Sequence, residues 1–253
     1  MNNDYIRSLL EKGKRIDGRK LDEFRKIIIE TNISKNAAGS ARCKIGSTEV
    51  IVGVKFDMGE PYPDSPDEGT IIVTAELIPV ASPDFELGPP GSKATELARI
   101  VDRGIRESKC IDFKKLCIKE GEKIWMVFID IYPLNDDGNL VDASVLASLK
   151  ALSEAKFPKI VDGRIDHENK TNNGLKLNKF PITTTMYKIN GNILVDVNNK
   201  EEQVVDARLS VSIADGNIHA LQKGGNASLS VEEITKMIDI AIKKEKELAS
   251  FLK

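Results

Sequence analysis

A glycine turn that carries three carboxylates has the most distinctive chemistry in this chain. Residues 136–142 read Asp-Asp-Gly-Asn-Leu-Val-Asp, follow an apolar stretch at residues 123–132, and precede a helical pattern that begins near Leu140. The first turn of a helix presents free backbone N–H groups and the positive end of the helix dipole, which attract anions. However, the turn contains no Arg, Lys, Ser or Thr. One like charge about 4 Å from a phosphate costs roughly 4 kcal/mol at an effective dielectric constant near 20. The backbone therefore predicts an anion site, whereas the side chains predict repulsion.

A structural role is the alternative for this turn. Polar turns of this composition are common, and carboxylates near the start of a helix interact favourably with its dipole. From these residues alone, both interpretations stay open.

Three arginines form the second candidate site. Arg99, Arg103 and Arg106 are spaced i, i+4 and i+7, so on a helix they share one face opposite an apolar stripe. A solvated, ion-paired face is again the alternative, because each arginine has an acidic residue at helical spacing, worth about 0.2–0.5 kcal/mol per pair. The three pairs are Glu96 with Arg99, Asp102 with Arg106, and Arg103 with Glu107.

The first half of the chain must position both candidates. Alternating apolar residues predict strands, and periodic apolar residues predict helices. We expect a short amphipathic segment at 5–11, strands at 26–31, 40–45, 48–56, 70–80 and 124–131, and helices at 93–108 and 140–156. Proline-rich loops are expected at 57–69 and 81–92.

The second half repeats the order of strands first and helix last. Strands are expected at 181–189, 192–197, 204–214 and 217–222, joined by turns at Asn190-Gly191 and Asp215-Gly216. Ser230 with Glu233 forms a capping box that starts a final helix. Residues 157–178 are polar and patternless, so they predict a linker or extended arm.

This organisation predicts an α+β fold with mixed or antiparallel sheets, helices and internally duplicated halves. We predict an N-terminal extension at residues 1–30, a first domain at 31–165 and a second domain at 181–253.

Composition excludes several functional classes. The 253 residues include 37 Lys and Arg against 39 Asp and Glu, a net charge of −2, so RNA contact requires a local basic patch. Three cysteines without C-x-x-C spacing predict no metal site. No run of about 18 apolar residues occurs, and Met1-Asn2-Asn3-Asp4 does not begin a signal peptide, so we expect a cytoplasmic protein without membrane contact.

Several motifs together resemble the RNase PH family, whose members degrade RNA from its 3′ end by phosphorolysis. The resemblance covers nearly the whole chain, from about Arg15 to Leu252, and is closest to the non-catalytic RNase PH-like subunits of archaeal exosome rings. The segments that carry it are residues 15–19, 39–52, 89–106, 130–132 and 205–209.

The resemblance implies that the catalytic groups are missing. Active members carry Gly-Gly-Thr-Arg-Thr at the helix start; aligned on Gly138, this chain has Asn139, Leu140 and Val141. Apolar side chains cannot replace a bidentate guanidinium.

The acidic pair of the family has also changed. Active members have an acid followed six residues later by a catalytic Asp; here these positions hold Glu202 and Arg208. A guanidinium cannot act as a general acid or base near neutral pH. We therefore expect no catalytic residues and no cofactor in this chain.

The resemblance also implies a role in RNA binding. Catalytic members carry an Arg pair just before the arginine helix that grips RNA phosphates; the matching residues here are Ser92 and Lys93. The expected RNA-binding residues are thus Lys93, Arg99, Arg103 and Arg106.

The expected function is a non-catalytic exosome subunit. It would alternate with a catalytic RNase PH-like partner in a hexameric ring, support the partner's active site and help bind single-stranded RNA, with RNA-binding cap subunits on one face. Two alternatives remain: an active phosphate-dependent 3′–5′ exoribonuclease, and a structural ring spacer without RNA contact.

Overall fold

Alternation of buried and exposed side chains shapes the large sheet of the computed structural model. Along β3, Val50, Val52, Val54 and Phe56 are buried, and the residues between them are half-buried or exposed. The strand order is β1-β2-β3-β6-β4; β4 pairs with β6 in parallel, the other neighbours pair antiparallel, and β5 pairs with β6. The strands are β1 (Ile27–Thr31), β2 (Gly39–Ile45), β3 (Thr48–Gly59), β4 (Thr70–Ala75), β5 (Cys117–Lys119) and β6 (Lys123–Asn135).

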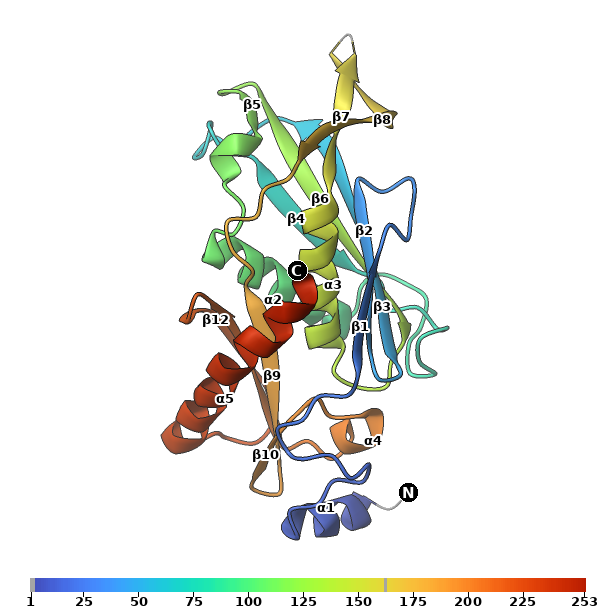
Figure 1. Ribbon diagram of the computed structural model, residues 1–253, viewed down its shortest axis with the longest axis vertical. Coiled ribbons are helices and arrows are strands. Elements are labelled where there is room, and N and C mark those ends of the chain that lie inside the picture. Colours follow the sequence, from blue (N-terminus) through green and yellow to red (C-terminus); the bar gives the residue numbers. More distant parts are fainter. Residues whose placement is uncertain (1–2, 162) are drawn as a thin grey trace.

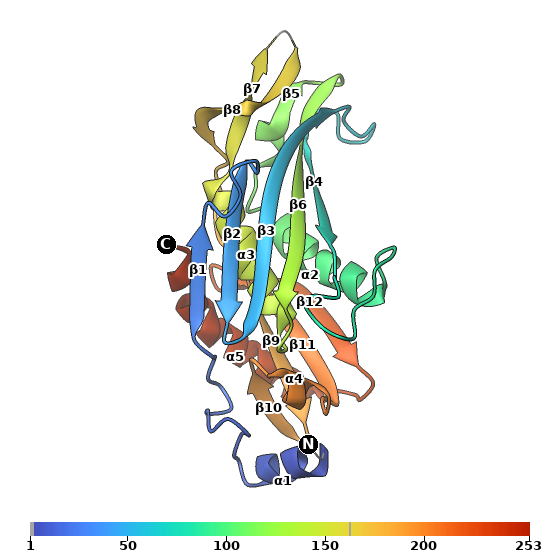
Figure 2. The same cartoon turned by 90° about the vertical axis from the view of Figure 1, so that its right-hand side faces the viewer.

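Two helices, α2 (Ser92–Ser108) and α3 (Leu140–Glu154), cover one face of this sheet (Figures 1 and 2). The helix α3 contacts β2 and β3 on one side and β9 (Ile182–Ile189) of the second sheet on the other, which explains why most of its residues are buried. The helix α2 contacts β4 and also β11 (Ala207–Ala214) and β12 (Asn217–Gly225). Both helices therefore lie between the two halves of the chain.

The second sheet has the order β10-β9-β11-β12 and is antiparallel. Its predicted turns are confirmed, with positive φ at Asn190, Gly191, Asp215 and Gly216. The capping box of Ser230 and Glu233 is also confirmed and starts α5. The elements are β9 (Ile182–Ile189), β10 (Asn192–Val195), β11 (Ala207–Ala214), β12 (Asn217–Gly225) and α5 (Val231–Ala249).

The two faces of the second sheet differ in chemistry. Met186, Leu209 and Val211 pack with Met237 and Ala241 of α5. The opposite set of side chains on β9 and β11 is rich in hydroxyls and includes Thr183, Thr185, Ser210 and Ser212. This polar face lies toward α2 and α3.

The N-terminal segment packs on the end of the second sheet. The helix α1 (Asn3–Glu11) buries Ile6 and Leu10 against a cluster that contains Tyr187, Leu194 and Val204. In Figure 1, α1 lies at the bottom of the molecule beside α4 (Asn199–Glu202) and β10. The first residues of the chain therefore depend on its last third.

Two sequence predictions were wrong. Residues 157–178 are mainly a hairpin of β7 (Lys156–Val161) and β8 (Arg164–Gly174), which projects at the top of Figure 1. Their polar composition hid the strands, because a projecting two-stranded ribbon has little buried surface to impose alternation. The strand predicted at 70–80 ends at Ala75, before Pro79, which has no N–H to donate to a ladder.

Several short elements were not predicted. They are α4, β5 and the 3₁₀ helices at Phe113–Leu116 and Ser250–Leu252. Each spans only three or four residues, which is too short for a periodic pattern.

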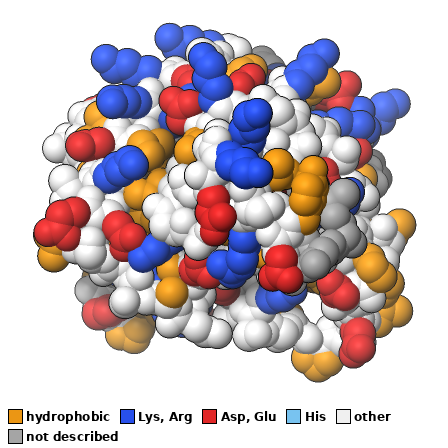
Figure 3. All heavy atoms as spheres, turned by 90° about the horizontal axis from the view of Figure 1, so that it is seen from below, with side chains coloured by type: hydrophobic (Ala, Val, Ile, Leu, Met, Phe, Trp, Pro, Cys, Tyr) orange, Lys and Arg blue, Asp and Glu red, His pale blue; other side chains and the backbone are white. Residues whose placement is uncertain are grey.

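The structure describes residues 3–161 and 163–253, with the side chains of His167 and Glu168 excepted. Met1 and Asn2 of the predicted N-terminal extension, and Asp162, lie outside the described residues. None of the helices described is both long and apolar enough to cross a bilayer. Figure 3 views the end near α1, where Lys and Arg side chains are interspersed with Asp and Glu, so this face carries no field of one sign.

A matched pair of glycine substitutions tests the packing of α3 on the large sheet. A Cβ on Gly39 would lie 2.7 Å from the Cα and N atoms of Ala155 and closer still to the carbonyl oxygen of Ala151. Gly53 in β3 offers room, because a Cβ added there would come no closer than 3.9 Å to the nearest atom beyond its chain neighbours, the Ala37 Cβ. We expect Gly39→Ala to lower the free energy of unfolding by about 2 kcal/mol or more. Gly53→Ala should change it by less than about 0.5 kcal/mol. Urea unfolding of both variants measures the difference, and equal effects would contradict this packing.

Candidate functional site

The turn between β6 and α3 has a strained left-handed backbone. Gly138 has a φ of 81° and Asn139 a φ of 61°, and α3 begins at Leu140. A Cβ on Gly138 would lie 2.6 Å from the carbonyl oxygen of Val197, so only glycine allows the loop after β10 to approach this closely. The turn is therefore fixed by the second half of the chain.

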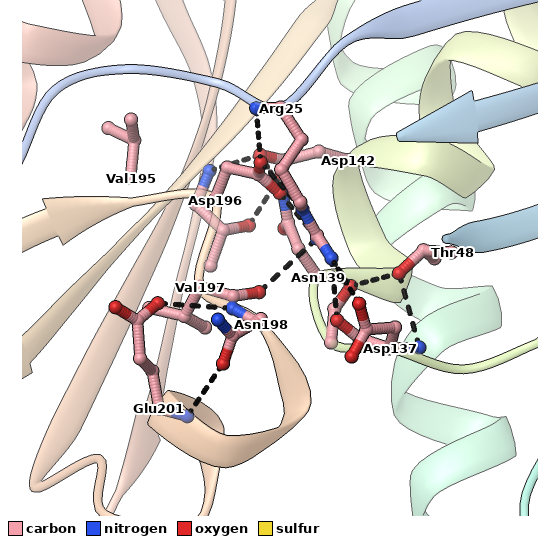
Figure 4. Close-up of polar contacts among 12 residues, drawn as sticks. Arg25, Thr48, Asp137, Asn139, Asp142, Val195, Asp196, Val197, Asn198 and Glu201 are labelled. Carbon is pink, nitrogen blue, oxygen red and sulfur yellow. Dashed lines mark hydrogen bonds and ion pairs between the residues drawn. The ribbon is translucent and has the colours of Figure 1, made fainter. Parts of the chain in front are cut away.

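An ion-pair network around Asp196 holds this turn (Figure 4). Arg25 donates from Nη2 to Asp196 Oδ1 at 2.7 Å and from Nη1 to the carbonyl oxygen of Asp137 at 2.7 Å. Arg19 donates to Asp196 Oδ2 at 2.9 Å, and Asn139 Nδ2 donates to Asp196 Oδ1 at 3.1 Å. Burial disfavours ionisation of Asp196, but the hydrogen bonds and charge of Arg25, supported by Arg19, outweigh it and lower its pKa.

A second buried pair secures the N-terminal segment. Arg15 and Glu201 have fully buried side chains and form a bidentate pair with N···O distances of 3.0 and 2.5 Å. Arg15 also donates to the carbonyl oxygens of Val195 and Asp196 at 3.0 and 2.7 Å. With these hydrogen bonds the buried guanidinium is satisfied, which limits the cost of burying the charges.

The third carboxylate of the turn region, Asp142, is buried in the protein interior. It accepts hydrogen bonds from Thr185 Oγ1 at 2.8 Å, from the Thr185 amide at 3.2 Å and from Asn139 Nδ2 at 3.1 Å. No arginine is among these donors. Burial raises the pKa of Asp142 to about 7, and the hydrogen bonds reduce that rise only in part.

The prediction that three carboxylates face an incoming anion is wrong. Asp142 points toward β9, and Asp137 forms an ion pair with Arg25 at 3.1 Å. Asp136 lines a cavity beside α3. The sequence could not indicate this, because Arg25 lies 112 residues before Asp137.

This cavity, which we name the α3 pocket, brings the separate sequence motifs together. It has a volume of about 420 Å³. Its lining includes Lys93, Asp136, Leu140, Val141, Glu202 and Arg208. Gly138 and Asn139 do not line it; Asn139 is buried and donates to Asp142 and Asp196. Leu140 and Val141 of the predicted phosphate position therefore meet Glu202 and Arg208 of the predicted acid position in one cavity.

Glu202 is held over this pocket by α4. The helix starts with a capping box in which Asn198 accepts from the amide of Glu201 and Glu201 accepts from the amide of Asn198. Although Glu202 retains contact with solvent, the surrounding pocket walls and the nearby Asp136 carboxylate raise its pKa to about 7, against the opposing influence of Arg208 and Lys93. Burial likewise raises the pKa of Asp136.

Arg208, which the sequence resemblance matched to the family's catalytic acid, is an ion-pair donor. Its Nη2 lies 2.6 Å from Oε2 of Glu96 on α2. A Cβ on Gly224 would lie 2.6 Å from Arg208 Nε, so the glycine on β12 leaves space for the guanidinium. A charged pair therefore links β11 to α2.

A second cavity, the α2 pocket, lies between α2 and the strands β11 and β12. It has a volume of about 470 Å³, and its lining includes Arg99, Arg103, Ser212 and Leu221. Arg99 and Arg103 are exposed, and within residues 3–161 and 163–253 neither forms an ion pair. The expected pairs Glu96–Arg99 and Arg103–Glu107 are thus absent from the described part of the chain.

Arg106 does not join these two arginines. It forms the expected helical pair with Asp102, donates to the carbonyl oxygen of Ile71 at 3.1 Å and lies over the ring of Phe113. The hydrogen bond and charge of Asp102 raise the pKa of Arg106. Lys93 lines the α3 pocket instead, so the four predicted RNA-binding residues occupy three different surroundings.

Comparison with known proteins defines the class of this fold and site. The model of 3′ exoribonuclease family domain 1, RNase PH, matches residues 23–158, and that of domain 2 matches residues 179–244. The chain belongs to the RNase PH family and has its fold, with helices and mixed or antiparallel sheets.

Particular relatives are close. The exosome complex component Rrp42 of Methanothermobacter thermautotrophicus is 44% identical over 250 residues, which cover 98% of this chain and 92% of that protein. Its counterpart in Methanocella arvoryzae is 48% identical over 242 residues, 95% of this chain and 91% of that protein. A chain of the Archaeoglobus fulgidus exosome with RNA bound to the active site has a TM-score of 0.92 and 45% identity, covering 99% of this chain and 97% of that one.

Sequence reasoning missed the residues that support the site. Arg19, Arg25 and Asp196 gave no local signal, because they act across more than 170 residues. The helix α4 did leave a signal: Asn198 with Glu201 is a capping-box pattern.

Replacing Asp142 tests the buried network through its pH dependence. A native pKa of about 7, above the ordinary value of 3.8, means that the folded state binds the proton more tightly than the unfolded state. The resulting stabilisation is complete below about pH 4 and is lost as the pH rises through 7. In Asp142→Asn the amide can donate to Thr185 Oγ1 and accept the remaining hydrogen bonds. We expect the variant to lack this loss and to gain on the order of 2 kcal/mol over wild type between pH 5 and 8.

Denaturant unfolding at several pH values provides the measurement. The contribution of Glu202, whose pKa is also raised, is common to both proteins and cancels in the difference. Parallel stability curves between pH 5 and 8 would contradict a titrating Asp142.

Proposed function

We propose that this chain is a ring component of an archaeal exosome that binds RNA but does not cleave it. The similarity to proteins named as exosome components, and to chains of exosome core structures, supports membership of such a complex. The family resemblance supports a hexameric ring in which this chain alternates with a catalytic RNase PH-like partner. RNA-binding cap subunits would lie on one face of that ring. The proposed site of action is the cytoplasm.

The composition of the α3 pocket carries the proposal of inactivity. Leu140 and Val141 present hydrocarbon where an orthophosphate oxyanion would need donors. Arg208, paired with Glu96, stands where a proton would have to be exchanged. Asp136 and Glu202 add negative charge to the same cavity. Missing hydrogen-bond donors, a group that cannot exchange a proton and repulsion of like charge thus each oppose phosphorolysis.

The α2 arginines carry the proposal of RNA binding. Arg99 and Arg103 are exposed cations that line the α2 pocket. Lys93 precedes Arg99 by six residues on the same helix. Guanidinium groups that are not used in ion pairs remain available to phosphate oxygens. In a chain with a net charge of −2, such a local patch is what RNA contact requires.

Assaying the purified chain by itself tests inactivity. We expect no release of nucleoside diphosphates from single-stranded RNA with orthophosphate, and activity only after the catalytic partner is added. Chromatography of the products and the mass of the mixed complex are the measurements. Turnover by this chain alone, at a rate that scales with its concentration, would make it an enzyme.

Replacing the three cations of α2 tests RNA binding. In the assembled ring, Lys93→Ala with Arg99→Ala and Arg103→Ala should weaken RNA binding and reduce the dependence of log K on log salt. The reason is that a protein that makes fewer phosphate contacts releases fewer counterions when it binds RNA. The expected reduction in slope is about 0.7 per contact for a single strand.

A matched control removes three other exposed lysines, Lys236, Lys243 and Lys246 of α5, which form no ion pair among the described residues. The control should retain the wild-type affinity and slope. If both triple variants behave like wild type, the chain is a structural spacer.

A further inference from the structure

The ion pair of Arg208 with Glu96 separates the two pockets. Glu96 lines both the α2 pocket and the α3 pocket, and its carboxylate is held by Arg208 at 2.6 Å. Arg208 belongs to β11 and Glu96 to α2, so the pair spans the junction between the two halves of the chain. Both side chains are largely shielded, with 21% and 34% of their surfaces exposed.

Glu96 has another potential partner on its own helix. Arg99 follows Glu96 at i+3, a spacing at which Glu and Arg side chains meet on a helix. In the structure this pair does not form, and among residues 3–161 and 163–253 Arg99 has no ion-pair partner. Thus one carboxylate stands between two arginines and is bound by the one that comes from β11.

We infer that Arg208 is a positioning residue for RNA binding: by holding Glu96, it keeps Arg99 free for RNA phosphates. This inference deepens the proposed function and rests on it. Without Arg208, Glu96 would turn to Arg99, and this ion pair would neutralise a guanidinium that RNA phosphates would otherwise contact. The position that has lost the catalytic acid thereby serves the neighbouring basic surface.

The surroundings of Arg208 favour this indirect role over direct contact with RNA. Arg208 points to Glu96 and lies against Gly224 of β12, where an added Cβ would come within 2.6 Å of its Nε. It lines the α3 pocket together with Asp136 and Glu202, and these carboxylates repel phosphate. Arg99 lines the other cavity and is exposed. Glu96 therefore pairs with Arg208 and leaves Arg99 without an ion pair among the described residues.

A double-mutant cycle in the assembled ring tests the inference. Binding of a single-stranded oligoadenylate is measured by fluorescence anisotropy without orthophosphate, at several salt concentrations, for wild type, Arg208→Met, Glu96→Gln and the double variant. We expect Arg208→Met to bind about threefold to tenfold more weakly with a reduced salt slope, since Glu96 then pairs with Arg99 and the phosphate contact of Arg99 is lost. The double variant should return to within about twofold of wild type, because the interfering carboxylate is gone.

Within the cycle, Glu96→Gln alone should bind as tightly as wild type or more tightly. Two further arms carry Arg99→Met, without and with Arg208→Met. In a ring that carries Arg99→Met, binding should be weaker, and adding Arg208→Met should have no further effect. Ring mass and thermal unfolding verify assembly for each variant.

The outcomes distinguish this inference from the proposed function. If Arg99→Met weakens binding but Arg208→Met does not, the positioning role is wrong and the RNA site stands. If the loss caused by Arg208→Met persists in the Glu96→Gln background, Arg208 acts directly and the inference is wrong. Weaker binding of Glu96→Gln alone would also overturn it. If Arg99→Met has no effect, the RNA-binding site itself is misplaced.

Discussion

The buried carboxylate of Asp196 is the interaction on which the rest of the site depends. It receives Arg19 and Arg25 from the N-terminal segment and Asn139 from the start of α3. The N-terminal segment, the start of α3 and the loop that carries Asp196 are distant in sequence and meet at the two oxygen atoms of this carboxylate. A buried charge is stable only when its hydrogen bonds are satisfied, so each part requires the other two. This convergence fixes the left-handed turn at Gly138 and Asn139 and with it the direction of α3.

The same convergence determines what the α3 pocket contains. Because Asn139 and Asp142 face the interior, the pocket receives the apolar side chains of Leu140 and Val141 and the carboxylate of Asp136. Glu202 and Arg208 then enter from α4 and β11. Arg208 is paired with Glu96, and the carboxylates of Asp136 and Glu202 lie in the same cavity, so the charged groups are not arranged around an anion. The adjacent α2 pocket is lined by two arginines that form no ion pair among the described residues, so the two pockets differ in charge.

Sequence patterns predicted those parts of the molecule that are governed by local physics. Alternation, helical periodicity and the Asn190-Gly191 and Asp215-Gly216 turns predicted both sheets and the long helices, because each signal lies within a few neighbouring residues. The convergence of Leu140, Glu202 and Arg208 followed only from the family resemblance, since spacing does not bring them together. The partners of Arg15, Arg19 and Arg25 could not be predicted. A contact over 186 residues, such as Arg15 with Glu201, leaves no mark on local composition.

The docking of α1 on the second sheet has a consequence for biosynthesis. Ile6 and Leu10 leave the ribosome long before Tyr187, Leu194 and Val204, which cover them, are translated. Until then the apolar face of the helix lacks its native contacts, and Arg15 lacks its partner Glu201. Contacts with such large sequence separation form late. All strands of the large sheet are therefore synthesised before α1 can make its native contacts. A ribosome that stalls before residue 187 yields a product in which the apolar face of α1 is exposed.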